Sequence, residues 1–87
     1  MTADPVSVYR AARDAYRAAA VREDAAFRRW FIKRQAHEPT NGGAAARLAH
    51  ETNRLRADLH SAQSALYALD LDPWDIDDAD GVERTPV

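Results

Sequence analysis

The sequence has no cysteine among its 87 residues, which excludes a disulfide framework and a thiolate metal site. Glycine and proline are rare, with 3 and 4 residues, so little in the chain interrupts helix formation. Aromatic side chains make up only 8% of the residues, and no apolar run approaches the roughly 20 residues of a membrane-spanning helix. We therefore expect a soluble protein without a membrane partner.

A chain of this length forms one domain, and it buries only about 60% of the surface that its unfolded form exposes. Its own hydrophobic core is therefore expected to be marginal. The first residues contain neither the basic segment nor the apolar segment of a secretory signal peptide. The expected location is the cytoplasm.

Charge is distributed unevenly along the chain. Residues 1–69 hold 11 Lys and Arg against 7 Asp and Glu, whereas residues 70–87 hold one Arg against 7 acidic residues. The chain thus consists of a basic body with a net charge of +4 and an acidic tail with a net charge of −6. The abundance of Arg and Ala is typical of GC-rich genomes such as those of actinobacteria and their phages.

The first half of the chain predicts one long helix over about residues 5–37. Asp4 can accept hydrogen bonds from the free amides of the first turn, and Pro5 at the first helical position loses no needed donor. No Gly or Pro follows until Pro39, and that proline disfavours helical backbone at Glu38. The helix is therefore expected to end just before Glu38.

The second half contains the most regular pattern in the sequence. Apolar and small residues recur in alternating steps of four and three, which keeps them on one face of a helix. This leucine seam consists of Leu48, Thr52, Leu55, Leu59, Ala62, Leu66 and Leu69. It predicts a helix over about residues 44–69 that packs along another helix.

A turn at residues 38–43 joins the two predicted helices, and so short a connection favours antiparallel neighbours. The predicted fold is all-α: an antiparallel, coiled-coil-like helical hairpin over residues 1–71. A turn centred near residue 40 places Leu66 opposite Tyr16. Because a lone hairpin leaves half of each apolar stripe exposed, we expect two copies to form a homodimeric four-helix bundle.

The remaining residues, 72–87, predict an acidic and largely disordered tail. An Asp-Pro pair at its start allows a helical turn over residues 73–78. Trp74 and Ile76 are the candidate recognition residues of this tail. In the hairpin the tail begins beside the start of the first helix, whose basic residues are Arg10, Arg13 and Arg17.

No residue pattern indicates catalysis. The three histidines, His37, His50 and His60, are too far apart in the sequence to form a metal-binding pair on one helix turn. A glycine-rich phosphate loop and a nucleophile with its base are also missing from the sequence. We therefore predict a protein that is not an enzyme and that needs no metal, cofactor or small-molecule substrate.

Positive and aromatic side chains are interleaved near the end of the first predicted helix. The candidate partner-binding residues are Phe27, Arg28, Arg29, Trp30, Phe31, Lys33 and Arg34. One interpretation is structural: Phe27 and Trp30 pack on the second helix, and the cations favour the helix C-terminus. The others are functional: the segment binds a nucleic acid backbone, a membrane surface or an acidic protein partner.

The predicted function is a small helical protein–protein interaction module, an oligomeric adaptor or regulator. Its expected partners are a second copy of itself and another protein. The alternative is a nucleic-acid-associated regulator that uses the basic aromatic end of the first helix. The protein interpretation is favoured because one short basic patch is a weak nucleic-acid signal and the sequence pI is acidic, about 5.8.

Overall fold

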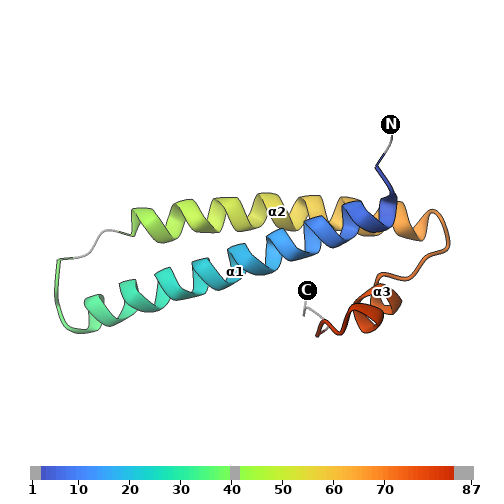
Figure 1. The fold of residues 1–87 in the computed structure, drawn as a ribbon. Coiled ribbons are helices and arrows are strands. Elements are labelled where there is room, and N and C mark those ends of the chain that lie inside the picture. Colours follow the sequence, from blue (N-terminus) through green and yellow to red (C-terminus); the bar gives the residue numbers. More distant parts are fainter. Residues whose placement is uncertain (1–2, 40–41, 84–87) are drawn as a thin grey trace.

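The computed structural model describes residues 3–39 and 42–83. Across these two ranges the chain is all-helical. The helices are α1 (Pro5–Gln35), α2 (Gly43–Tyr67) and α3 (Pro73–Asp80). Helices α1 and α2 run antiparallel as a hairpin, and α3 lies against the end where the hairpin opens (Figure 1). The predicted all-α class with two long helices packed against each other is confirmed.

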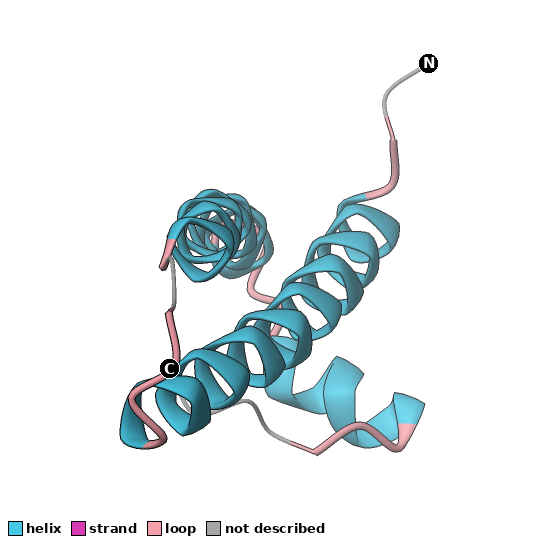
Figure 2. Cartoon of the chain, turned by 90° about the vertical axis from the view of Figure 1, so that its left-hand side faces the viewer, coloured by secondary structure: helices cyan, strands magenta, loops and turns pink. Residues whose placement is uncertain are grey.

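The molecule is elongated, with extents of 52 × 26 × 18 Å. Its radius of gyration is 16.3 Å, compared with about 12 Å for a compact domain of this length. In Figure 2, where α2 is seen nearly end-on, α1 runs obliquely past it, and α3 lies below the two long helices. We call the end with the α1–α2 connection the turn end, and the end that α3 covers the open end.

Helix α1 starts as predicted and ends earlier than predicted. The side chain of Asp4 accepts a backbone hydrogen bond from the first turn, and Pro5 occupies the first helical position. At the other end, His37 adopts a left-handed conformation with a φ of 58°, and the Glu38 amide donates to the Lys33 carbonyl. This closing bond ends the helix at residue 35 rather than at residue 37.

Helix α2 also ends through a left-handed residue. Asp70 has a φ of 58°, and the Leu71 amide donates to the carbonyl five residues earlier. The helix therefore stops at Tyr67 instead of residue 69. At its start, α2 begins one residue before the predicted position 44, and two residues of the predicted turn 38–43, residues 40–41, lie outside the described residues.

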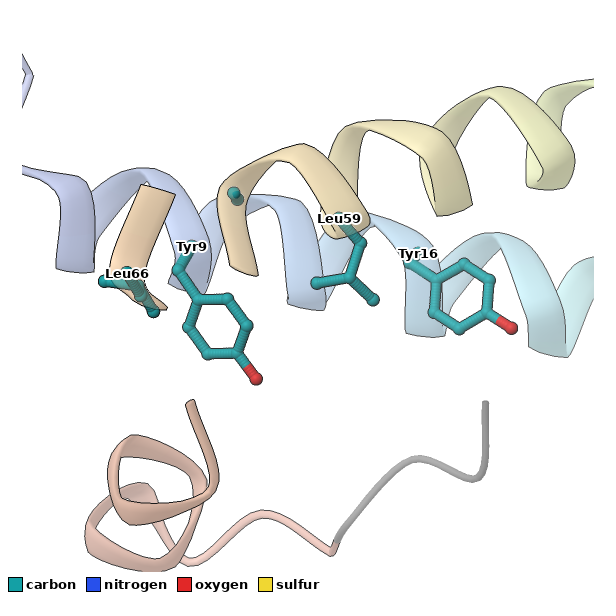
Figure 3. Close-up of a cluster of buried hydrophobic side chains, with 5 residues drawn as sticks. Tyr9, Tyr16, Leu59 and Leu66 are labelled. Atoms are coloured by element: carbon teal, nitrogen blue, oxygen red, sulfur yellow. The ribbon is translucent and has the colours of Figure 1, made fainter. Parts of the chain in front are cut away.

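The hydrophobic core lies at the open end, where the three helices meet (Figure 3). Its buried members are Tyr9, Tyr16, Leu59, Ala62 and Leu66. Ile76 of α3 packs against this cluster. The leucine seam forms the α2 side of the core, although Leu69 lies past the end of the helix and is 56% exposed.

The predicted register between α1 and α2 is wrong by about two helical turns. The expected neighbour of Tyr16 was Leu66, whereas its hydroxyl accepts a hydrogen bond from Arg56 at 3.4 Å. Arg22 pairs with Glu51 in the same register, at 3.4 Å. The reason is that α1 extends past the start of α2 at the turn end (Figure 1).

The acidic tail differs most from its prediction. The sequence indicates a largely disordered segment over residues 72–87 with a helical turn allowed at 73–78, whereas the structure has helix α3 over Pro73–Asp80. The side chain of Asp72 accepts a hydrogen bond from the Trp74 amide at 2.9 Å, and Gly81 ends the helix with a φ of 70°. Helix α3 is ordered because it buries apolar side chains and carboxylates against the hairpin. Residues 84–87 of the tail lie outside the described residues.

Candidate functional site

The last turns of α1 carry the seven predicted partner-binding residues, which we call the turn-end surface. Helix α2 covers this segment only in part because it begins beside Trp30: a Cβ atom placed on Gly42 would lie 3.4 Å from Trp30 Nε1. Every residue from Phe31 to Pro39 is exposed. Helix α1 therefore projects beyond α2 and presents its last turn to solvent.

Aromatic rings dominate one side of the turn-end surface. The ring centroids of Phe27 and Phe31 are 6.3 Å apart, and those of Phe27 and Trp30 are 5.7 Å apart. Phe27 is 51% exposed and Phe31 is 47% exposed, whereas Trp30 is half-buried. The three rings line a shallow hollow of about 400 Å³. They form an exposed apolar patch of the kind that partners cover.

The cations of the turn-end surface surround these rings. Arg34 places its guanidinium carbon 5.3 Å from the Trp30 ring centroid, which is cation–π geometry. Arg28 pairs with Asp24 one turn earlier, at 3.0 Å, and both side chains are largely exposed. Lys33 lies in the last turn of α1, where a positive charge is favourable. The patch is thus apolar at its centre and basic at its edge.

The interpretation that the aromatic residues of this segment only pack on the second helix accounts for Trp30 and not for the phenylalanines. Trp30 contacts the start of α2 and is half-buried, as packing between the helices requires. Phe27 and Phe31 stay about half exposed. Partner binding by the turn-end surface remains a prediction, and the two phenylalanines are its best-placed anchors.

The two predicted recognition residues of the tail lie on opposite sides of α3. Ile76 faces the hairpin and packs against the hydrophobic core. Trp74 is 53% exposed on the outer side. Of this pair, only Trp74 is accessible to a partner, and Ile76 serves to hold α3 in place.

A second hollow lies between α1 and α2 at the turn end, beside Phe27. Its volume is about 490 Å³. The lining residues are Ala20, Glu23, Asp24, Phe27, Ala45, Ala46 and Ala49. The small alanine side chains leave a groove there.

At the open end, a partly buried cluster of polar side chains joins α1 to α3. The Tyr9 hydroxyl lies 2.8 and 2.9 Å from the two carboxylate oxygens of Asp77. Arg13 Nη1 donates to Asp77 at 3.0 Å and to Asp80 at 2.7 Å. Arg10 binds Asp80 with two parallel hydrogen bonds, each 3.0 Å long. We call this set of five residues the Tyr9–Asp77 cluster.

Burial makes the Tyr9–Asp77 cluster more than a surface ion pair. Tyr9 is 2% exposed, Asp77 3% and Arg13 5%. Arg17 adds a hydrogen bond of 2.8 Å to the Glu83 carbonyl, just past α3. The prediction that the tail lies nearest to the basic start of α1 is confirmed by these contacts.

The contacts shift the pKa values of three groups in the cluster. Burial, followed by the hydrogen bond to Asp77, raises the pKa of Tyr9 well above its ordinary value of 10.0. Burial alone would lower the pKa of Arg13, but its hydrogen bonds to carboxylates outweigh that effect and raise it. Hydrogen bonds from Arg10 and then Arg13 lower the pKa of Asp80. All three shifts favour the protonation states that hold α3 on α1 near neutral pH.

Sequence reasoning missed this cluster as a built site, although a signal for it exists. Arg10, Arg13 and Arg17 are spaced so that they share one face of α1, and Asp77 and Asp80 share one face of a short helix. Matching the two spacings would have indicated helix-to-helix ion pairing rather than a loose tail. The two spacings match only if the tail is helical, because a helix puts Asp77 and Asp80 on one face.

Within the described ranges, no group of three His, Asp or Glu residues gathers as a metal site would require. No helix in those ranges is both long and apolar enough to cross a membrane. Comparison with protein-family models, with curated proteins and with solved structures gave no match. The candidate site therefore rests on the chain's own geometry: a turn-end surface and an acidic α3.

Proposed function

We propose that this chain is a small, non-enzymatic helical interaction module that acts as a homodimer. Two hairpins supply the four long helices of the dimer, and the turn-end surface takes part in binding. The observation that carries the proposal is the half-exposed pair Phe27 and Phe31, flanked by cations. Large aromatic side chains next to arginine are typical of the energetically important centres of protein interfaces.

The surface area of the chain supports association. Its accessible surface is 6335 Å², whereas a compact monomer of the same mass, 9.7 kDa, would expose roughly 5,100 Å². The excess is of the order of the ~800 Å² that one partner buries in a standard interface. A dimer would remove this excess and cover the exposed rings.

Sedimentation velocity at micromolar concentration tests the proposal. The wild type is expected to sediment with the mass of a dimer. Replacing both Phe27 and Phe31 with serine is expected to shift the mass toward that of a monomer. Val21→Ser is the matched control, because Val21 is 70% exposed and lies outside the turn-end surface. A folded wild-type monomer at this concentration would contradict homodimerisation.

Nucleic-acid binding is the second candidate function, and the interleaved rings and cations of the turn-end surface favour it. Arginines can contact phosphates while exposed aromatic rings stack on bases. Affinity for duplex and single-stranded DNA should be measured across a salt series. Binding that falls steeply between about 50 and 200 mM salt would support this function. Absence of binding at the lowest salt would exclude it.

A further inference from the structure

Helix α1 presents the same combination of side chains at two places along one face. Phe27 and Arg28 each follow Tyr9 and Arg10 by 18 positions. At about 3.6 residues per turn this spacing equals five turns, so the two pairs point the same way and lie about 27 Å apart. Helix α3 contacts the first pair: it covers Tyr9, and its Asp80 binds the exposed Arg10. The second pair has the same aromatic and cationic character, and its phenylalanine is 51% exposed.

The surroundings of the second pair also resemble a docking site for a helix. At the open end, Pro73 is buried and Ile76 packs on the hydrophobic core, so α3 occupies the surface that α1 and α2 form there. At the turn end, a groove of about 490 Å³ lies between α1 and α2 beside Phe27, lined by four alanines and by Glu23 and Asp24. The hairpin therefore has one filled and one open site for a short helix. The positive charge that favours an acidic helix there comes from the exposed Arg28 and Arg34, not from the groove itself.

The chain's own α3 cannot fill the open site. It is fixed at the open end by Asp77, whose carboxylate is buried on Tyr9 and Arg13. Its 8 residues span only about 12 Å, less than half of the roughly 27 Å that separates the two sites. The occupant must come from another molecule.

The outer face of α3 has the chemistry that the open site requires. Trp74 is 53% exposed there, and Asp75 and Asp78 are exposed beside it. At 100° per residue these three side chains lie on the opposite side of α3 from Ile76 and Asp77. This face is aromatic and acidic, whereas the turn-end surface is aromatic and basic. The two surfaces are complementary in charge and occur on the same chain.

We propose that two copies associate antiparallel, with the outer face of each α3 docked on the turn-end surface of the other copy. The inference rests on the proposed self-association and names its contacts. A two-fold axis across the middle of the hairpins creates both contacts at once, because each copy offers one α3 and one open site. Each α3 then lies between two hairpins and holds its own hairpin through Asp77 and its partner through Trp74.

The test uses two charge-reversed forms of the full chain. In the α3 variant, Asp75 and Asp78 are both changed to Lys. In the turn-end variant, Arg28 and Arg34 are both changed to Glu. Each variant alone brings like charges together at both contacts of its homodimer, so self-association at about 50 mM salt should weaken at least about tenfold. Far-UV circular dichroism confirms that each variant keeps its helices.

Mixing the two variants gives the decisive result. In the heterodimer one contact pairs Lys with Glu and the other pairs the original residues, so both contacts are attractive again. Sedimentation equilibrium of the equimolar mixture should show dimers with an affinity near that of the wild type. A mixture no tighter than the separate variants would overturn the proposed contacts.

An uncharged pair of variants tests the same contacts without electrostatics. Phe27→Ala and Trp74→Ala should each weaken the dimer at least about fivefold, as expected for aromatic interface residues. Tyr67→Ala is the control, since Tyr67 is 60% exposed and lies outside both surfaces. A wild-type dimer that none of these variants weakens would overturn the contacts and leave homodimerisation standing. A wild-type monomer would overturn both proposals.

Discussion

The two ends of the hairpin use one face of α1 in opposite ways. At the open end Tyr9 is 2% exposed, and at the turn end, five turns later, Phe27 is 51% exposed. The difference is the third helix, which covers Tyr9 and leaves Phe27 uncovered. The comparison teaches what a third helix adds to this hairpin: the face of α1 is covered where α3 lies and stays exposed at the turn end, where the described residues place no further helix.

The ion pairs at the two ends also differ in burial. The open end holds a buried ion pair between Arg13 and Asp77, with side chains 6% and 5% exposed. The turn end holds an exposed pair between Asp24 and Arg28, with side chains 59% and 76% exposed. Both distances are 3.0 Å. Because the distances are equal and the burial is not, removing one partner of each pair should change the free energy of unfolding by very different amounts.

The largest effect is expected for Asp77→Ala. This change leaves the Arg13 guanidinium and the Tyr9 hydroxyl buried without their shared acceptor, which should cost about 3–5 kcal/mol of unfolding free energy. Asp24→Ala removes the exposed pair at the turn end and should cost at most about 0.5 kcal/mol. Urea unfolding at one fixed protein concentration measures both. Similar losses for the two variants would contradict the burial of the open-end pair.

The next effect compares apolar side chains. Leu59 is 2% exposed in the hydrophobic core, so Leu59→Ala should cost about 2–5 kcal/mol. Phe31 is 47% exposed, and Phe31→Ala should change the stability of the folded chain by less than about 1 kcal/mol. Asp58→Ala, on the exposed side of α2 next to the seam, should change it by less than about 0.5 kcal/mol. Equal effects at Leu59 and Asp58 would mean that the seam is assigned to the wrong face.

The ends should also differ in their response to pH. The lowered pKa of Asp80 means that the folded chain binds this proton less tightly than the unfolded chain. The stabilisation is therefore present above the ordinary value of 3.8 and is lost as the pH falls below it. Tyr9 has a raised pKa, so its contribution is present below 10.0 and is lost as the pH rises above that value. Docking of α3 should hold between these limits.

The two tryptophans allow each end to be observed separately. In Trp30→Phe the remaining Trp74 reports on α3, and in Trp74→Phe the remaining Trp30 reports on the turn end. As the pH falls below about 3.8, Trp74 fluorescence should change before Trp30 fluorescence, because Asp80 lies on α3. Simultaneous changes would mean that the two ends do not respond independently.

The sequence predicts the features of this fold that depend on neighbouring residues. Asp4 with Pro5 marks the start of α1, and the spacing of the leucine seam marks the buried face of α2. The ends of both long helices were misplaced because His37 and Asp70 adopt left-handed backbone, and neither residue type signals this as glycine would. Local chemistry therefore gives the elements but not their last residues.

Long-range contacts explain the larger errors. Tyr9 and Asp77 are 68 positions apart, and the order of α3 depends on their meeting. The composition of the tail alone indicates disorder, because its apolar residues are few and its charge is high. The interleaved rings and cations of the turn-end surface are visible in sequence, and partner binding by them stays a prediction. The register between α1 and α2 was misplaced, since it depends on how far α1 projects beyond α2.

The smallest expected effect concerns the left-handed residues that end each helix. Gly81 has a φ of 70°, and an added Cβ would meet nothing within 4 Å. Gly81→Ala should therefore act through backbone strain alone and cost about 1 kcal/mol. His37→Gly relieves the same kind of strain at the turn end, where φ is 58°. Its gain should be smaller, about 0.5 kcal/mol, because glycine loses more backbone freedom on folding.

Comparing these two variants by thermal unfolding sharpens the contrast between the ends. Gly81→Ala should also promote undocking of α3, visible as a change in Trp74 fluorescence, because Gly81 ends that helix. His37→Gly should leave Trp74 fluorescence unchanged, since His37 lies at the far end of the hairpin. A stabilising Gly81→Ala would show that the left-handed turn does not hold α3 in place. The open end would then depend on the Tyr9–Asp77 cluster and the apolar contacts of Ile76 alone.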